Sequence, residues 1–171
     1  MDFFRIIEER RSMRHYTGTP LGGEKLHRIL AAANRAPSAG NLQSYEIYIV
    51  RKLEQRQELV KASFDQEFLA EAPVVLVFCA HPSLSAVKYG ERGANLYSIQ
   101  DATIACTFAV LAATALGLST VWVGAFDEQA VSQAIHLPPE LRPVILLPVG
   151  YAAKAPGERP RRALKDLIHE A

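Results

Sequence analysis

The sequence predicts a single three-layer domain, of the α/β or α+β class, in which helices cover a central sheet. Segments with strand patterns alternate along the chain with segments that repeat apolar residues at helical spacing. Residues 73–80 form a continuous apolar run of strand length, as expected for a central strand covered on both faces. Because 171 residues suffice for one hydrophobic core, we expect residues 1–171 to form one domain.

The individual elements follow from hydrophobic periodicity and turn residues. Strands are expected at 44–51, 73–80, 119–125 and 142–150. Helices are expected at 2–11, 22–36, 53–62, 96–116 and 127–136. Gly117 and Asp127 stand where the last two helices need a left-handed C-cap and an N-cap, respectively. Residues 81–95 are predicted to be a polar connection with room for a helical turn, and the tail from 153 to hold a turn, a basic cluster and a final helical stretch.

Residues 102–126 carry no charged side chain, and by length alone this run could cross a bilayer. Residues 117–120 interrupt it, and Val121, Trp122 and Val123 have the composition of a strand. A buried helix, a turn and a buried strand therefore explain the run better than a membrane span. The helix is rich in alanine and apolar on all sides, which is typical of a large core or a subunit interface and predicts a homodimer.

Charge and cysteine usage restrict the partners and the compartment. The formal net charge is +1, so no overall field would attract nucleic acid or an anionic membrane. Cys79 and Cys106 lie inside apolar runs without disulfide or metal spacing, which favours a reducing compartment. The first ten residues mix acids and bases and lack the pattern of a signal peptide, so we expect a cytoplasmic protein.

The sequence lacks the common self-contained catalytic motifs. No G-x-G-x-x-G follows a strand, and neither a P-loop nor a G-x-S-x-G elbow is present. The five histidines are scattered and form no H-x-x-x-H pair, which argues against a protein metal site. This combination favours chemistry supplied by a bound cofactor.

Two groups of arginines suggest a phosphate site. The first group, near the amino terminus, combines guanidinium forks with a hydroxyl and comprises Arg10, Arg11, Ser12 and Arg14. The second group, near the other end of the chain, comprises Arg159, Arg161 and Arg162. Both groups could converge on one dianionic phosphate. Alternatively, the first is a solvated helix end and the second a solvated tail.

Two further segments suit a flat ring. The segment 36–43 places a proline, a glycine and the polar side chains of Ser38, Asn41 and Gln43 at a helix end, where they could meet the heteroatom edge of a heterocycle. Gly124 and Ala125 follow an apolar strand pattern, so a ring could lie directly against their backbone. Alternatively, the segment 36–43 is an ordinary loop between a helix and a strand, and Gly124 and Ala125 simply end a strand before a capped helix.

Six segments in chain order resemble the FMN-dependent nitroreductase family and together cover essentially the whole chain. They are R-R-S-x-R at 10–14, A-P-S-A-G-N-x-Q at 36–43, E-A-P-V-V-x-V at 71–77, L-Y-S-I-Q-D-A-T-I-A at 96–105, A-L-G-L-S-T-V-W-V-G-A-F at 115–126, and P-V-G-Y at 148–151 with R-x-R-R-x-L at 159–164. Each motif alone is weak evidence, whereas six in register are specific.

The resemblance implies an α+β fold, a nitroreductase-like three-layer α/β/α sandwich with a mostly antiparallel sheet of four to five strands. It also implies a homodimer with the long alanine-rich helix at its core and interface, and two FMN molecules each touched by both chains. The residues it implicates in holding the phosphate and ribityl chain are Arg10, Arg11, Ser12, Arg14, Arg159 and Arg161. Those it implicates around the ring are Pro37, Ser38, Ala39 and Asn41 from the partner chain, Gln66 at the pyrimidine edge, and Gly124 and Ala125 near the reactive nitrogen.

The implied activity is that of an NAD(P)H-dependent FMN oxidoreductase with a ping-pong mechanism. NADH or NADPH gives a hydride to the flavin and leaves, and a nitroaromatic, quinone or similar small molecule then takes two electrons in the same place. The chain departs from the family pattern at 43–45, where Q-S-Y replaces Q-P-W, and at 81–95, which is expected to be short where relatives insert a helix. It also ends at residue 171, where larger relatives continue. These departures predict a more open, less selective site.

Two other functions fit the same residues. The chain could be a flavin-binding protein of this fold without turnover. It could also belong to a specialised branch of the family that carries out reductive dehalogenation or flavin fragmentation.

Overall fold

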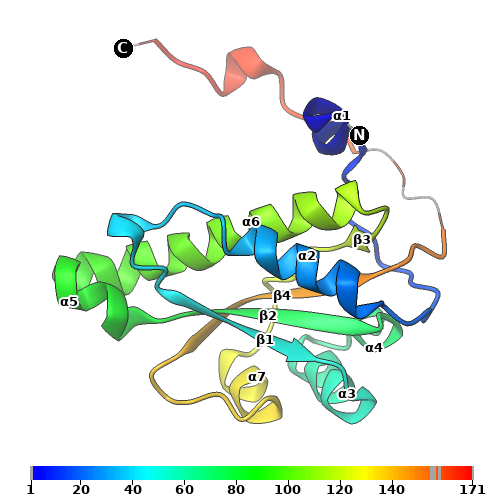
Figure 1. Ribbon diagram of the computed structural model, residues 1–171, viewed down its shortest axis with the longest axis horizontal. Coiled ribbons are helices and arrows are strands. Elements are labelled where there is room, and N and C mark those ends of the chain that lie inside the picture. Colours follow the sequence, from blue (N-terminus) through cyan, green and yellow to red (C-terminus); the bar gives the residue numbers. More distant parts are fainter. Residues whose placement is uncertain (1, 155–156, 158, 171) are drawn as a thin grey trace.

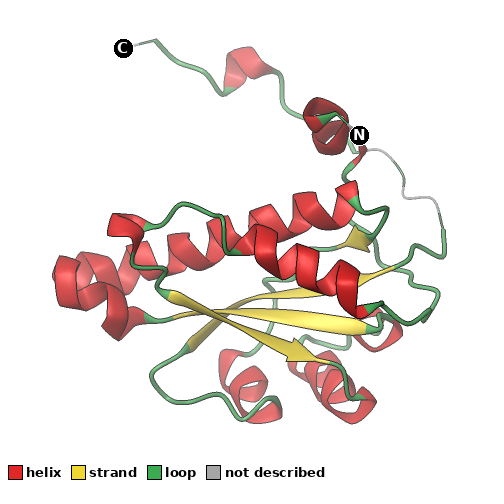
Figure 2. Ribbon diagram, viewed as in Figure 1, coloured by secondary structure: helices red, strands yellow, loops and turns green. Residues whose placement is uncertain are grey.

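In the computed structural model, a four-stranded sheet lies between two layers of helices (Figures 1 and 2). The structure describes residues 2–154, 157 and 159–170. The strands are β1 (Tyr45–Val50), β2 (Val74–Ala80), β3 (Ser119–Thr120) and β4 (Arg142–Gly150). Their order is β1-β2-β4-β3, and each neighbouring pair is antiparallel. The predicted three-layer α+β architecture is confirmed.

Alternation along β2 builds the two halves of the core. Val74, Leu76 and Phe78 pack under α2 (Gly23–Ala33) and α6 (Ser98–Ala115) on one face. The intervening Val75, Val77 and Cys79 pack on the other face with the helices α3 (Leu53–Ala62), α4 (Phe68–Glu71) and α7 (Glu128–Ala134). Every residue of β2 is buried, as the continuous apolar run at 73–80 predicts.

The remaining elements surround these layers. Helix α1 (Phe3–Glu9) lies outside the helical layers, in contact with α6 on the side where α6 ends, and the tail with its 3₁₀ turn η3 (Leu164–Asp166) extends past it (Figure 1). A 3₁₀ turn, η1 (Ala39–Asn41), precedes β1. Helix α5 (Pro82–Arg92) and a π-helical turn, η2 (Gly93–Tyr97), lead directly into α6.

Helix α6 buries its alanine-rich face against the sheet. Ala102, Ala105 and Ala109 are fully buried, and small side chains let the helix approach β2 and β4 closely. The helical residues Pro82–Ala115 are long and apolar enough to span a membrane by length and composition, a test that the core helix of a soluble protein also passes. The predicted C-cap is confirmed: Gly117 has φ 72°, and Leu118 N–H donates to the Ala113 carbonyl at 2.9 Å.

The prediction of a polar connection at 81–95 was wrong, because these residues form α5 and η2. Pro82 occupies the first turn of α5, where its missing N–H costs nothing. Gly90 leaves the helical backbone with φ 56° and ψ −143°, so the glycines suggested a loop where the structure has a kinked helix. The predicted absence of a helix at 81–95 therefore no longer supports the expectation of a more open site.

The predicted strand at 119–125 is shorter than expected. Only Ser119 and Thr120 pair as β3, and Val123 adds a single bridge to Leu146. The amino-terminal segment joins β3 on its other edge, where Ser12 bridges Thr120 in parallel and the Thr120 carbonyl accepts the N–H of Met13 at 2.9 Å. The final helical stretch of the tail is likewise reduced to the turn η3.

Gly150 allows the end of β4 to pack against two rings. A Cβ at this position would lie 2.7 Å from Pro73 Cδ and 3.0 Å from Tyr16 Cδ1. We therefore expect Gly150→Ala to lower the free energy of unfolding by about 1–3 kcal/mol, measured by urea denaturation. Gly23→Ala, where a Cβ meets open space, is the matched control and should be neutral or slightly stabilising. Equal stability of both variants would contradict this packing.

Candidate functional site

Residues from the two ends of the chain meet around one cavity of about 890 Å³. Its amino-terminal lining includes Arg10, Arg11, Ser12 and Arg14. Its carboxyl-terminal lining includes Lys154, Gly157, Arg159 and Arg161. The structure thus brings Arg159 and Arg161 together with the first arginine group, almost 150 residues away in sequence. Arg162 is not among the described lining residues, and its guanidinium donates to the Asp166 carbonyl at 2.7 Å. Lys154, which sequence reasoning missed, adds a further cation.

The cavity is strongly cationic and has little to balance its charge. Among the described lining residues, Glu8 provides the single carboxylate. Burial lowers the pKa of the Arg10 guanidinium, and the neighbouring charges of Arg161 and Arg11 lower it further. Clustered like charges are unfavourable on their own and become favourable when an anion binds between them. The cavity therefore has the chemistry of an anion site.

Backbone pairing aims the first arginine group at the cavity. Residues 12 and 13 pair with β3, where Ser12 bridges Thr120 in parallel and Met13 N–H donates to the Thr120 carbonyl, and Tyr16 bridges Ala152 farther along. Met13 is buried, whereas Ser12 and Arg14 are exposed. Since side chains alternate along an extended segment, burying Met13 turns its two neighbours outward, into the cavity lining.

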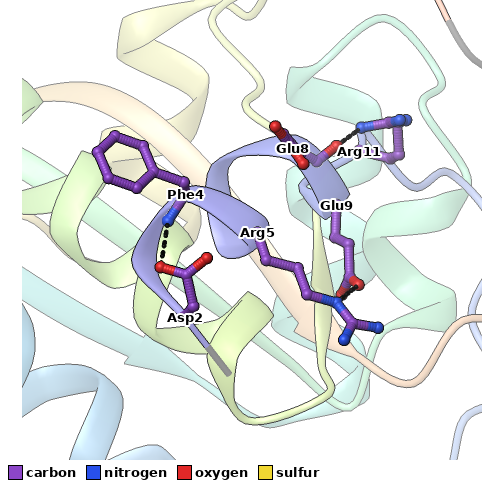
Figure 3. Close-up of polar contacts among 6 residues, drawn as sticks. All are labelled: Asp2, Phe4, Arg5, Glu8, Glu9 and Arg11. Atoms are coloured by element: carbon purple, nitrogen blue, oxygen red, sulfur yellow. Dashed lines mark hydrogen bonds and ion pairs between the residues drawn. The ribbon is translucent and has the colours of Figure 1, made fainter.

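Arg11 has a second role at the end of α1. Its guanidinium donates to the carbonyl of Glu8 and, at 3.0 Å, to that of Arg10, so it satisfies carbonyl groups that the helix end leaves without partners (Figure 3). At the other end, Asp2 Oδ1 accepts the N–H of Phe4 at 3.3 Å. Arg11 therefore both lines the cavity and caps the helix beside it.

A smaller, mainly apolar cavity of about 240 Å³ adjoins the cationic one through Arg10. It lies between α6 and the segment after β3, and its other lining residues are Thr107, Val110, Leu111, Thr120, Val121 and Trp122. Trp122 is 41% exposed and lies between the buried Val121 and Val123, so a large apolar side chain faces outward at this cavity. Charged and apolar cavities that share one arginine suit a ligand with an anionic end and an apolar body.

The predicted ring-facing segment is held by Gln66. The Gln66 Nε2 donates to the Ala125 carbonyl at 3.0 Å and to the Ser63 carbonyl at 2.9 Å. Gly124 and Ala125 are themselves exposed, so the backbone at this strand end is accessible. The structure thus brings three predicted site residues together, with Gln66 fixing the position of Ala125.

The predicted loop at 37–41 stands apart from the arginines of the same chain. Pro37, Ser38, Ala39 and Asn41 do not line the 890 Å³ cavity. Their loop is attached to the first turn of α6, where Ala39 N–H donates to Asp101 Oδ1 at 3.0 Å. The arginine segment is bonded beyond the other end of this helix, at Thr120 (Figure 1). Asp101 was missed from the sequence, although it is the last charged residue before the charge-free run.

Comparison with known proteins identifies the family of this arrangement. The model of the nitroreductase family matches residues 7–68 and 64–151. The chain is 28% identical to "FMN reductase [NAD(P)H]" of Bacillus subtilis, over 99% of this chain and 73% of that protein. It is 29% identical to "Oxygen-insensitive NADPH nitroreductase" of Salmonella typhimurium, over 94% of this chain and 70% of that protein.

A solved structure shows the same similarity in three dimensions. The "NADPH:FMN oxidoreductase from Vibrio harveyi complexed with NAD+" superposes with a TM-score of 0.90 at 26% identity, covering 98% of this chain and 76% of that one. The similarity extends over both arginine groups and the intervening sandwich, because nearly the whole chain is aligned.

Proposed function

The chain belongs to the nitroreductase family, and from this premise we propose that it is an NAD(P)H-dependent FMN oxidoreductase. Relatives across its length carry the names FMN reductase, NADPH nitroreductase and NADPH-flavin oxidoreductase. The observation in this structure that carries the proposal is the cavity in which arginines from both ends of the chain meet. In a family of flavin enzymes, an anion site lined by arginines from both ends of the chain is best explained by a cofactor phosphate.

The residues present fit FMN. Arg10, Arg14, Arg159 and Arg161 supply planar forks for the phosphate dianion, and Ser12 supplies a hydroxyl. The apolar cavity beside Arg10 and the exposed backbone of Gly124 and Ala125 suit the less polar remainder of the molecule. When bound, FMN supplies the hydride chemistry. The protein's own contribution is to hold the phosphate, orient the ring and admit NAD(P)H and a small-molecule acceptor in turn.

We further propose a homodimer in which Pro37, Ser38, Ala39 and Asn41 serve the partner's site. In a single chain this loop and the arginines are attached near opposite ends of α6, a helix about 27 Å long. A second chain would bring its loop to the site that the first chain leaves incomplete. Large apolar side chains stand exposed on α1 and on the tail, and they would be covered in such a pair: Phe3, Phe4, Ile7, Leu164, Leu167 and Ile168.

The proposed setting is the cytoplasm, with residues 1–171 acting as one domain. Burial raises the pKa of the Cys79 thiol to about 12 and that of Cys106 well above its usual value, so both remain protonated and unreactive. Two buried free thiols are consistent with a reducing compartment.

Anaerobic reduction of the purified protein tests the proposed function. We expect the protein to bind added FMN, and the absorbance of the bound flavin to bleach on addition of NADH or NADPH. Addition of a quinone or nitroaromatic should restore the oxidised spectrum, with one acceptor molecule consumed for each two electrons stored. Bound flavin that neither nucleotide bleaches would instead support the alternative of a flavin-binding protein without turnover. Failure to bind FMN at all would contradict both.

A further inference from the structure

Asp101 is a buried carboxylate that holds a loop from outside its own helix. It is 2% exposed and lies in the first turn of α6. Its Oδ1 accepts the N–H of Ala39 at 3.0 Å, and its Oδ2 accepts the N–H of Ser44 at 3.2 Å. The two backbone amides compensate for the removal of the carboxylate from water. Both ends of the segment 39–44 are therefore attached to one side chain.

The segment between these two bonds has an unfavourable backbone conformation. Gly40, Asn41 and Gln43 have φ values of 57°, 58° and 53°, in the left-handed region. Glycine adopts this region readily, whereas Asn and Gln do so at a cost and persist there when the surroundings hold them. Within the loop, Ser38 Oγ accepts the N–H of Gln43 at 3.0 Å. The anchors at Asp101 thus maintain a conformation that the free chain would leave.

Helix α5 covers the loop on another side. A Cβ on Gly40 would lie 2.5 Å from Tyr89 Oη and 2.8 Å from Lys88 Nζ, so the glycine backbone is in close contact with α5. The side chains of Asn41 and Gln43 are exposed. The loop is therefore held from inside by α6 and from outside by α5, while its polar side chains remain available to another molecule.

We propose that Asp101 is a positioning residue for flavin binding: it holds residues 38–43 in the shape required by the FMN site of the partner subunit. The inference rests on the proposed function, and it adds a role for a residue that touches neither the cofactor nor the arginines. Because the carboxylate accepts two amides at once, a side chain with one acceptor oxygen cannot replace it fully.

Asp101→Asn tests this role with little change in volume. The amide keeps one acceptor, so either Ala39 N–H or Ser44 N–H must face an NH₂ group. We expect FMN affinity to fall by about tenfold or more, with a changed visible circular dichroism spectrum of the remaining bound flavin. Tryptic cleavage after the exposed Arg35, next to the loop, should become faster.

Ser98→Ala is the matched control on the same helix. Ser98 is also fully buried, and its Oγ donates to the Ala94 carbonyl, within the helical segment, at 2.8 Å. It should lower the melting temperature but leave FMN affinity and the flavin spectrum unchanged. If Asp101→Asn behaves like Ser98→Ala, Asp101 is merely structural and the inference is overturned. Wild-type protein that binds no FMN would instead overturn the proposed function.

Mixed dimers test whether the loop acts in the partner's site. A chain with Arg10→Ala is co-expressed with a differently tagged chain carrying Asp101→Asn, and the heterodimer is isolated by both tags. If the loop serves the partner, both defects fall in one site and the other site is intact, so the heterodimer binds one FMN with wild-type affinity. Two weakened sites, or the absence of a heterodimer, would overturn the inference.

Discussion

Replacing Ala109 with Trp is expected to unfold the domain or leave it only marginally folded. Ala109 is 0% exposed and packs in the core between α2, α6 and the strands β2 and β4. Overfilling a close-packed core costs about 1–3 kcal/mol for a few methylene groups, and an indole adds considerably more volume. Since domains of this size are stable by about 5–15 kcal/mol, the substitution removes a large share of that margin.

Urea denaturation followed by circular dichroism measures this effect. Gln100→Trp, at an exposed position of the same helix, introduces the same side chain without entering the core and should unfold near the wild-type midpoint. A wild-type midpoint for Ala109→Trp would mean that α6 does not pack on the sheet through its alanine face. Loss of the folded protomer would also remove the proposed dimer.

Replacing Arg10 or Arg161 with Ala is expected to weaken FMN binding while making the protein without cofactor more stable. Each arginine contributes charge-assisted hydrogen bonds to the phosphate, and each loss should cost about 1.5–3 kcal/mol of binding free energy. Without an anion, Arg10 and Arg161 repel each other, which is one reason why the pKa of Arg10 is lowered. Removing either charge relieves that repulsion.

Isothermal titration with FMN measures the expected loss of affinity, and thermal unfolding of the cofactor-free protein measures the expected gain in stability. The double variant should lose less affinity than the sum of the single losses, because both side chains face the same anion. Arg28→Ala, on the exposed face of α2, is the matched control and should change neither quantity. Full additivity, or loss of both affinity and stability, would mean that the two arginines do not share an anion site.

Local pattern was sufficient to predict most of the fold. The apolar run at 73–80 predicted the buried strand β2, and the spacing at 53–62 predicted α3 with the bounds it has in the structure. These elements were predictable because a strand buried on both faces has a continuous apolar run, and a helix buried on one face repeats apolar residues at helical spacing. The secondary structure of residues 81–95 could not be predicted in this way, because Gly90 and Gly93 are as compatible with a loop as with a kinked helix.

The chemical character of the candidate site was also predicted from the sequence, although Lys154 and Asp101 were missed. The sequence itself contains guanidinium groups near both ends, a polar loop after a helix and small residues after a strand. The order of these motifs identified the family. From the sequence alone, each group could also be a solvated helix end, tail or loop, because a sequence does not give the distances between residues.

Those distances are set by tertiary structure. The pairing of Met13 with Thr120 and the return of the tail bring Arg10 and Arg161 to one cavity, while Asp101 secures the loop at 39–44 near the far end of α6. Side-chain type is a property of the residue, so the chemistry could be predicted. Which residues meet depends on long-range strand pairing and on backbone amides that are identical at every position, so their partners became visible only in the folded protein.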